Sequence, residues 1–228
     1  MFFVYCMLYK ARIMSVFNKF KEWQFAKGRL EMFSDGVFAI VITLLVLELK
    51  MPEVEDPTDM HMVLTALVKV LPAFYSWVIS FFFVAIMWLH HHNIMHMASR
   101  SDYGVIWINN LLLFFICMLP FPTALMGHYH LPIFIALWGL TVSLTSTMLV
   151  WLYYYNSKNY LKDSYDKKQV MKNVRLSVFA APVMYLTGGL LAWVSIYISF
   201  VIYGLVPLLY LLPLDKEKKH DVVNDEID

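Results

Sequence analysis

Long apolar stretches dominate this sequence and restrict the folds open to it. A bilayer core about 30 Å thick is crossed by about 20 residues of helix. Six stretches meet this requirement; the first has a polar start from Arg29, and almost no loop separates the last two. They are residues 36–49, 71–95, 105–126, 133–154, 174–196 and 197–214. The chain is therefore predicted to be a helical membrane protein.

Composition supports the same class and leaves no soluble domain outside the helices. Apolar residues make up 60% of the chain and charged residues 15%, which is typical of polytopic membrane proteins. The alternating ten-residue patterns of a transmembrane barrel do not occur. We predict an all-α membrane protein with six transmembrane helices per subunit in residues 29–214. A cytoplasmic or interfacial arm (1–28) precedes them and a charged cytoplasmic tail (215–228) follows.

The distribution of Lys and Arg predicts the orientation. Of the 18 such residues, only Lys50 and Lys69 fall on the side reached by the end of the first span. The others fall on the opposite side: Lys10, Arg12, Lys19, Lys21, Lys27, Arg29, Arg100, Lys158, Lys162, Lys167, Lys168, Lys172, Arg175, Lys216, Lys218 and Lys219. By the positive-inside rule, both termini are cytoplasmic and the protein lies in the cell (inner) membrane. Because the basic residues follow one membrane face, they do not indicate nucleic-acid binding.

The first span combines an ionisable residue with an aliphatic stripe. Asp35 lies too deep to be an ordinary flanking residue, and an ionisable group at the edge of the hydrocarbon needs a partner. Steps of four and three place Ile40, Leu44 and Leu47 on one helix face, and Asp35 points roughly 140° away from Ile40. On spacing alone, such a stripe is more often a packing or lipid contact than a pore lining. Ser34 and Asp35 are also explained as residues at a helix start.

A histidine run, His90 to His92 with His96, falls near the end of the second span. His92 and His96 are one turn apart, a spacing that can hold zinc. No Cys or carboxylate accompanies them in sequence except the distant Asp102. We therefore predict no metal site and no cofactor, and we favour a pH effect through these imidazoles.

A motif opens the first span, and landmarks follow it in the next two. The motif is Arg29-x-x-x-Phe33-Ser34-Asp35, and the landmarks are Trp88, His91, Asn109 and Pro120. Over residues 29–214 this pattern resembles the endo-lysosomal potassium channel family called transmembrane protein 175. Animal members carry two six-helix repeats in one chain. This chain has one copy of the motif and so resembles the prokaryotic form, in which four subunits surround a pore lined by the first helix of each.

The resemblance implies a potassium-permeable cation channel with modest selectivity for K+ over Na+. It places a hydrophobic constriction at Ile40, Leu44 and Leu47, and a hydroxyl that bears on potassium preference at Thr43. It also implies a structural polar network that ties the first helix to the second and third, formed by Arg29, Phe33, Ser34, Asp35, Trp88, His91 and Asn109. Because other histidines flank His91, that assignment depends on its spacing from Trp88. The implied partners are identical subunits of a homotetramer, the lipid bilayer and monovalent cations, with K+ as the permeant ion.

Three classes of function are open to a helical membrane protein of this kind. Channels that select potassium with backbone carbonyls use a Thr-Val-Gly-Tyr-Gly loop; none occurs here, so we expect aliphatic side chains to gate the pore by dewetting. A proton-coupled secondary transporter using Asp35 and the histidines of the second helix is the alternative, but internal repeats and a midplane carboxylate are missing from the sequence. The spans carry no motif of an intramembrane enzyme. The sequence thus favours a channel without enzymatic activity.

Overall fold

The computed structural model describes residues 27–50, 52, 54 and 56–209, with 175–180 and 208–209 described in backbone only. The predicted arm (1–28) lies outside these residues except for its last two positions, and the predicted tail (215–228) lies outside them entirely. The described elements, in chain order, are α2 (Lys27–Leu44), the 3-10 turn η1 (Leu45–Glu48), α3 (Met60–Met97), α4 (Tyr103–Met118), α5 (Pro120–His128), α6 (Pro132–Asn159), α7 (Lys167–Leu191) and α8 (Ile196–Leu209).

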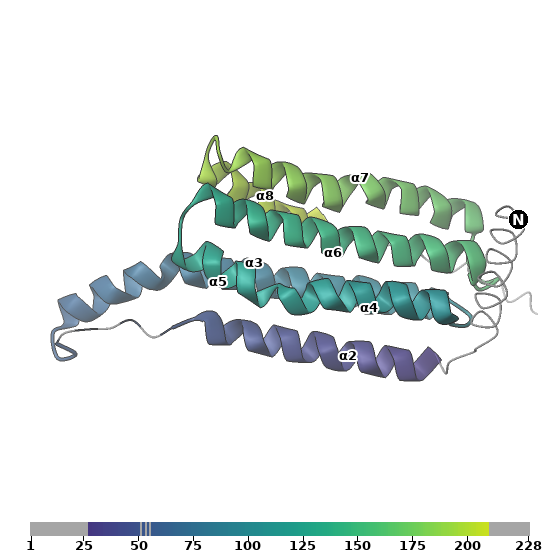
Figure 1. The fold of residues 1–228 in the computed structure, drawn as a ribbon, viewed down its shortest axis with the longest axis horizontal. Helices are drawn as coiled ribbons and strands as arrows, with labels where there is room; N and C mark the ends of the chain where they lie inside the picture. The colour runs from purple at the N-terminus through teal and green to yellow at the C-terminus, as the bar shows by residue number, and fades with distance from the viewer. Residues whose placement is uncertain (1–26, 51, 53, 55, 210–228) are drawn as a thin grey trace, which may run out of the picture.

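These helices form an antiparallel bundle (Figure 1). In Figure 1, α2 lies along one edge, α6 and α7 lie along the other, and α3 and α4 lie between them. α2 packs against both α3 and α4, whereas α6 packs most extensively against α7. We call the end of the bundle at which α2 begins the Lys27 end, and the opposite end the Lys50 end.

Four helical segments of the described chain are long and apolar enough to cross a bilayer: Lys27–Glu48, Met60–Met97, Tyr103–His128 and Pro132–Asn159. Two shorter apolar segments follow, Ala181–Leu191 and Ile196–Pro207. The helical architecture is confirmed for the described residues, and the four apolar segments support a multi-pass membrane protein. A count of six transmembrane helices stays a prediction.

α3 is longer than the second predicted span, which started at residue 71. The helix begins at Met60 because the Asp59 carboxylate accepts a hydrogen bond from the His61 backbone N–H at 2.8 Å, which satisfies an otherwise unpaired donor of the first turn. At 1.5 Å per residue, its 38 residues extend about 57 Å. That is nearly twice the hydrocarbon thickness, and the first turns of α3 project beyond the bundle at the Lys50 end (Figure 1).

The third predicted span, 105–126, is divided between α4 and α5 in the structure. Pro120 has no N–H for the carbonyl of Ile116, and the Leu119 N–H bonds that carbonyl instead at 3.1 Å. The side chain of Thr123 then donates to the carbonyl of Leu119 at 2.9 Å. The helix is thus interrupted for one residue and continues in the same direction.

An aromatic cluster at the centre of the bundle joins α6 to α3, α5 and α8. The indole N–H of Trp138 lies 2.9 Å from the Ser80 hydroxyl and 3.2 Å from the Thr123 hydroxyl. Its ring packs on Tyr203, with the ring centroids 4.6 Å apart. All four side chains are buried. The cluster satisfies the polar atoms that an aromatic core brings into the membrane.

Gly139 allows α6 to approach this cluster closely. A Cβ at this position would overlap the Tyr203 hydroxyl and lie 2.9 Å from the backbone carbonyl oxygen of Tyr185. Small residues of this kind let membrane helices pack backbone to backbone.

We predict that Gly139→Ala lowers the thermal unfolding midpoint of the purified protein, because overpacking costs about 1–3 kcal/mol. Gly28→Ala is the matched control, since a Cβ at Gly28 meets nothing within 4 Å. The control should leave the midpoint unchanged or raise it slightly. Equal midpoints for the two variants would contradict the packing account.

Candidate functional site

α2 has one covered face and one uncovered face. The covered face contacts α3 and α4 and consists of residues spaced three or four apart: Leu30, Ser34, Phe38, Val41 and, in η1, Leu45. This spacing follows the 3.6-residue turn, so each buried side chain lies one turn after the last. The covered residues therefore form a single stripe along α2.

The opposite face carries the aliphatic stripe predicted from the sequence. Ile40, Leu44 and Leu47 are 59%, 44% and 69% exposed. Thr43 is exposed on the same face, and its hydroxyl donates to the backbone carbonyls of Ile40 at 2.8 Å and Ala39 at 3.1 Å. The single chain thus brings these four side chains together and leaves them uncovered.

A chain of buried hydrogen bonds joins α2 to α3 and α4. The imidazole Nε2 of His91 lies 2.8 Å from Oδ1 of Asn109, and Nδ2 of Asn109 donates to Oγ of Ser34 at 2.9 Å. Ser34 donates in turn to the carbonyl of Leu30, also at 2.9 Å. Because an amide oxygen only accepts, Nε2 of His91 must be the donor. Each side chain then donates to the next one, from His91 on α3 through Asn109 on α4 to Ser34 on α2.

Asp35 makes a separate contact with α3. Its carboxylate accepts a hydrogen bond from the indole N–H of Trp88 at 2.8 Å. Arg29 and Phe33 are exposed on α2 and take no part in these bonds among the described residues. The structure thus brings five of the seven predicted network residues into direct contacts and leaves two outside them.

The interpretation of Ser34 and Asp35 as helix-start residues is wrong. α2 begins at Lys27, so both lie about two turns inside the helix. Ser34 bonds the carbonyl four residues before it instead of capping free N–H groups. The carboxylate of Asp35 therefore sits well inside the helix, where the indole of Trp88 donates one hydrogen bond to it.

The four histidines near the end of α3 lie on two faces of the helix. His90 and His91 are buried, whereas His92 and His96 are exposed. The His92 ring lies 6.0 Å from the Trp88 ring, centroid to centroid. No group of three or more His, Cys, Asp or Glu side chains among the described residues could hold a metal ion.

A second polar cluster, at the Lys27 end, was missed from the sequence. The buried carboxylate of Asp102 accepts bonds from the hydroxyls of Tyr155 at 2.8 Å and Tyr160 at 2.6 Å, and from the Val105 N–H at 2.9 Å. Burial and the bond to Asp102 raise the pKa of Tyr160 to about 12, so this phenol stays a donor at neutral pH. An Asp at the start of an apolar run was the available signal, since it predicts a helix cap.

The loops at this end also fasten the start of α2. The ammonium group of Lys27 donates to the carbonyl of Ala98 at 2.9 Å. Ala98 forms an isolated antiparallel bridge with Leu161, and the Lys162 N–H bonds the carbonyl of Met97 at 3.1 Å. The start of α2, the α3–α4 connection and the α6–α7 connection are thus held together.

Comparison with known proteins identifies the family. The family model described as "Endosomal/lysosomal potassium channel TMEM175" matches residues 29–120, which contain α3, α4 and all of α2 but its first two residues. A potassium channel from Chryseobacterium sp. is 30% identical over 190 residues, which cover 82% of this chain and 93% of that protein. The chain belongs to the TMEM175 family.

Further comparisons place this TMEM175 member among bacterial channels. A potassium channel from Chamaesiphon minutus is 42% identical over 102 residues. That match covers 45% of this chain and about half (50%) of the length of the relative. The crystal structure of a lysosomal potassium-selective channel TMEM175 homolog from Chamaesiphon minutus matches with a TM-score of 0.73 and 27% identity. It covers 83% of this chain and 98% of that chain, so the chain has the TMEM175 channel fold.

We predict that Asn109→Ala destabilises the protein by about 1–3 kcal/mol, because two buried polar groups lose their partner. The adjacent Asn110 is exposed, and Asn110→Ala should change the stability by less than about 0.5 kcal/mol. Thermal unfolding of the two purified variants measures the difference. A midpoint for Asn109→Ala equal to that of Asn110→Ala would show that the buried chain does not hold α2.

Proposed function

We propose that this chain is the subunit of a homotetrameric, potassium-permeable cation channel whose pore is lined by α2. The observation that carries the proposal is the division of α2 into a hydrogen-bonded inner face and an uncovered outer face bearing Ile40, Thr43, Leu44 and Leu47. Anchoring on one side is what a pore-lining helix needs, since the other side must remain open to the ion path.

The aliphatic stripe acts in this proposal as a hydrophobic constriction. Four copies of Ile40, Leu44 and Leu47 around one axis would exclude water when close together and admit a hydrated ion when apart. A single copy of α2 cannot enclose a path, so the function requires assembly. Relatives named potassium channels support the cation assignment.

Thr43 is proposed to contribute oxygen ligands for modest potassium selectivity. Its one hydroxyl proton is directed at the backbone of its own helix, so the lone pairs of the oxygen face away from that bond. A ring of four such oxygens would replace part of the hydration shell of a cation at the constriction.

The distribution of charge supports an orientation with cytoplasmic termini in the cell (inner) membrane. At the Lys50 end, the described Lys and Arg residues are Lys50 and Lys69. At the Lys27 end they are Lys27, Arg29, Arg100, Lys158, Lys162, Lys167, Lys168, Lys172 and Arg175.

The transporter alternative fits the structure less well. Asp35, its proposed proton carrier, lies at the middle of α2 and is bonded to Trp88, and His91 is bonded to Asn109. Both groups therefore serve to fasten helices. The structure supplies no specific observation that favours coupled transport.

Flux through the reconstituted protein tests the channel proposal. Liposomes containing the purified full chain should pass potassium down its gradient without a proton gradient, and faster than sodium. Flux that requires a proton gradient and saturates at a low rate would replace the channel with a transporter.

Leu44 and its neighbour Leu45 give a matched test of the constriction. Lowering a dewetting barrier by about 1 kcal/mol raises flux roughly fivefold, so Leu44→Ala should increase potassium flux and reduce selectivity. Leu45 is fully buried against the bundle, and Leu45→Ala should cost about 2–5 kcal/mol of stability without changing selectivity. If flux through Leu44→Ala matches the wild type, the stripe faces lipid.

Thr43→Ala should lower the ratio of potassium to sodium permeability by roughly fivefold, if the selective interaction is worth about 1 kcal/mol. Thr43→Ser keeps the hydroxyl and should retain most of the ratio. Reversal potentials under potassium and sodium gradients measure both variants. An unchanged ratio in Thr43→Ala would exclude this hydroxyl from selectivity.

A further inference from the structure

The first part of α3 extends beyond the rest of the bundle at the Lys50 end (Figure 1). The end of α5 reaches the level of Ala73, because a Cβ at Gly127 would lie 2.9 Å from the Cα of Ala73. From Ala73 to Met97, α3 already extends about 37 Å, which is enough to cross the hydrocarbon core of a bilayer. We call residues 60–72, which precede this part in the same helix, the α3 extension.

An apolar stripe runs along one face of the α3 extension. It consists of Met60, Leu64, Leu67 and Leu71, which are 70%, 54%, 51% and 57% exposed. Successive members are four, three and four residues apart. Val68 is 62% exposed and widens the stripe on one side. All five side chains are thus uncovered in the single chain.

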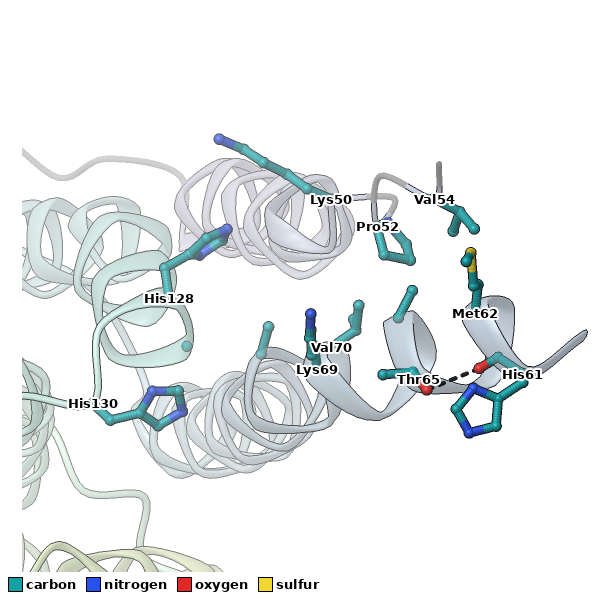
Figure 2. Close-up of a pocket in the computed structure, with 13 residues that line it drawn as sticks. Lys50, Pro52, Val54, His61, Met62, Thr65, Lys69, Val70, His128 and His130 are labelled. Carbon is teal, nitrogen blue, oxygen red and sulfur yellow. Dashed lines mark hydrogen bonds between the residues drawn. The ribbon is translucent and has the colours of Figure 1, made fainter. Parts of the chain in front are cut away.

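The opposite face of the extension packs within the chain itself. A cavity of about 640 Å³ lies between the segment after η1, the α3 extension and the end of α5, and Lys50 and Lys69 are among its lining residues. Figure 2 shows Met62, Lys69 and Val70 extending from α3 into this space. Lys69 follows Met60 by nine residues, so it points about 180° away from Met60. The stripe therefore faces away from the cavity, and none of its members lines it.

Lipid does not account for an apolar stripe at this position. At 1.5 Å per residue the extension is about 20 Å long, whereas the headgroup layer adds only about 5–8 Å on each side of the hydrocarbon. The extension continues along the long axis of the bundle and leans toward the edge at which α2 lies (Figure 1). It does not lie flat across the end of the bundle, as a helix buried in the membrane surface would. An apolar patch beyond the membrane marks a contact with protein.

The spacing of the stripe indicates that its partner is another helix. Apolar residues in alternating steps of four and three are the pattern of helices that pack side by side in a coiled coil. A seam between two helices needs only these positions, and the added Val68 gives the wider face found in bundles of more than two helices. Such a short segment does not associate by itself, so the contact requires subunits that are already held together.

We propose that the α3 extensions of identical subunits pack against one another through Met60, Leu64, Leu67 and Leu71 and form a short helical bundle at the Lys50 end. The partner is a second copy of this chain, because every copy presents the same uncharged stripe at the same height above the membrane. This inference rests on the proposed homotetramer, in which the neighbouring subunits lie on the α2 side toward which the extension leans.

Contact between the extensions would also limit the width of the pore. α2 packs on α3 in each subunit, so a contact that fixes the distance between α3 extensions restricts how far neighbouring α2 helices can separate. The same contact would therefore act on the constriction at Leu44 and Leu47 without lining it.

Disulfide cross-linking of the full chain in liposomes tests the contact. Leu64→Cys and Leu67→Cys are each made in a chain in which Cys6 and Cys117 are replaced by Ser, and copper phenanthroline catalyses oxidation by dioxygen. Both variants should form at least about fivefold more disulfide-linked dimer than Lys69→Cys on the opposite face, because a disulfide requires Cβ atoms about 4 Å apart. The cysteine-free chain measures the background.

Dissociation of the assembly in detergent gives a second measurement, by light scattering, that needs no cysteine. The protein concentration at which half of the tetramers dissociate should rise about tenfold in L64Q/L67Q, because two leucines per subunit lose their apolar contact. T65Q/K69Q changes the same turns outside the stripe and should retain the wild-type value. Equal values for the two double variants, or equal cross-linking of Leu64→Cys and Lys69→Cys, would overturn the contact.

Potassium flux into liposomes of the wild-type chain separates this contact from the proposed function. A wild type that passes no potassium, in a chain that cross-links through Leu64→Cys and Leu67→Cys, would refute the channel and leave the contact between extensions standing. A tetramer that passes potassium but does not cross-link at these positions would overturn the contact and leave the channel standing.

Discussion

The hydrogen bonds from His91 through Asn109 to Ser34 fix the position of α2, and the rest of the site depends on that position. α2 lies at the edge of the bundle and contacts α3 and α4 along one face. In a membrane interior, a rotation that broke these bonds would leave buried polar groups without partners. Apolar packing alone tolerates such a rotation far better, because one aliphatic contact replaces another. The polar chain therefore decides which side of α2 is covered and which is left open.

The same constraint separates two roles on one helix. In the sequence, Asp35 is an ionisable residue next to a long apolar stretch. In the structure, its carboxylate accepts a hydrogen bond from Trp88. Lys27 and the loop at Ala98 hold the start of the helix. The open face then carries side chains that are exposed in the single subunit, including Ile40, Leu44 and Leu47. A helix fastened at its start and middle keeps that face in register along its length.

The two ends of the bundle differ in how they use charge. At the Lys27 end, the carboxylate of Asp102 accepts hydrogen bonds from two tyrosines and from the first turn of α4. These bonds join the α3–α4 connection to the end of α6. At the Lys50 end, Lys50 and Lys69 border an open cavity. The first arrangement stabilises the fold internally, because both oxygens of the buried Asp102 carboxylate accept hydrogen bonds.

The sequence by itself determined the class of protein, the helical stretches, the family motif and the spacing of the stripe on α2. Each of these is local, since hydropathy and the 3.6-residue turn depend only on residues within one segment. The tertiary structure decided the start of α3 at Met60, the break at Leu119, the tyrosine contacts of Asp102 and the cavity at Lys50. It also decided that Ser34 lies inside a helix and bonds a neighbouring one. Contacts and cavities depend on which atoms meet across distant segments. The hydrophobic periodicity of one segment does not show which other segments it will contact.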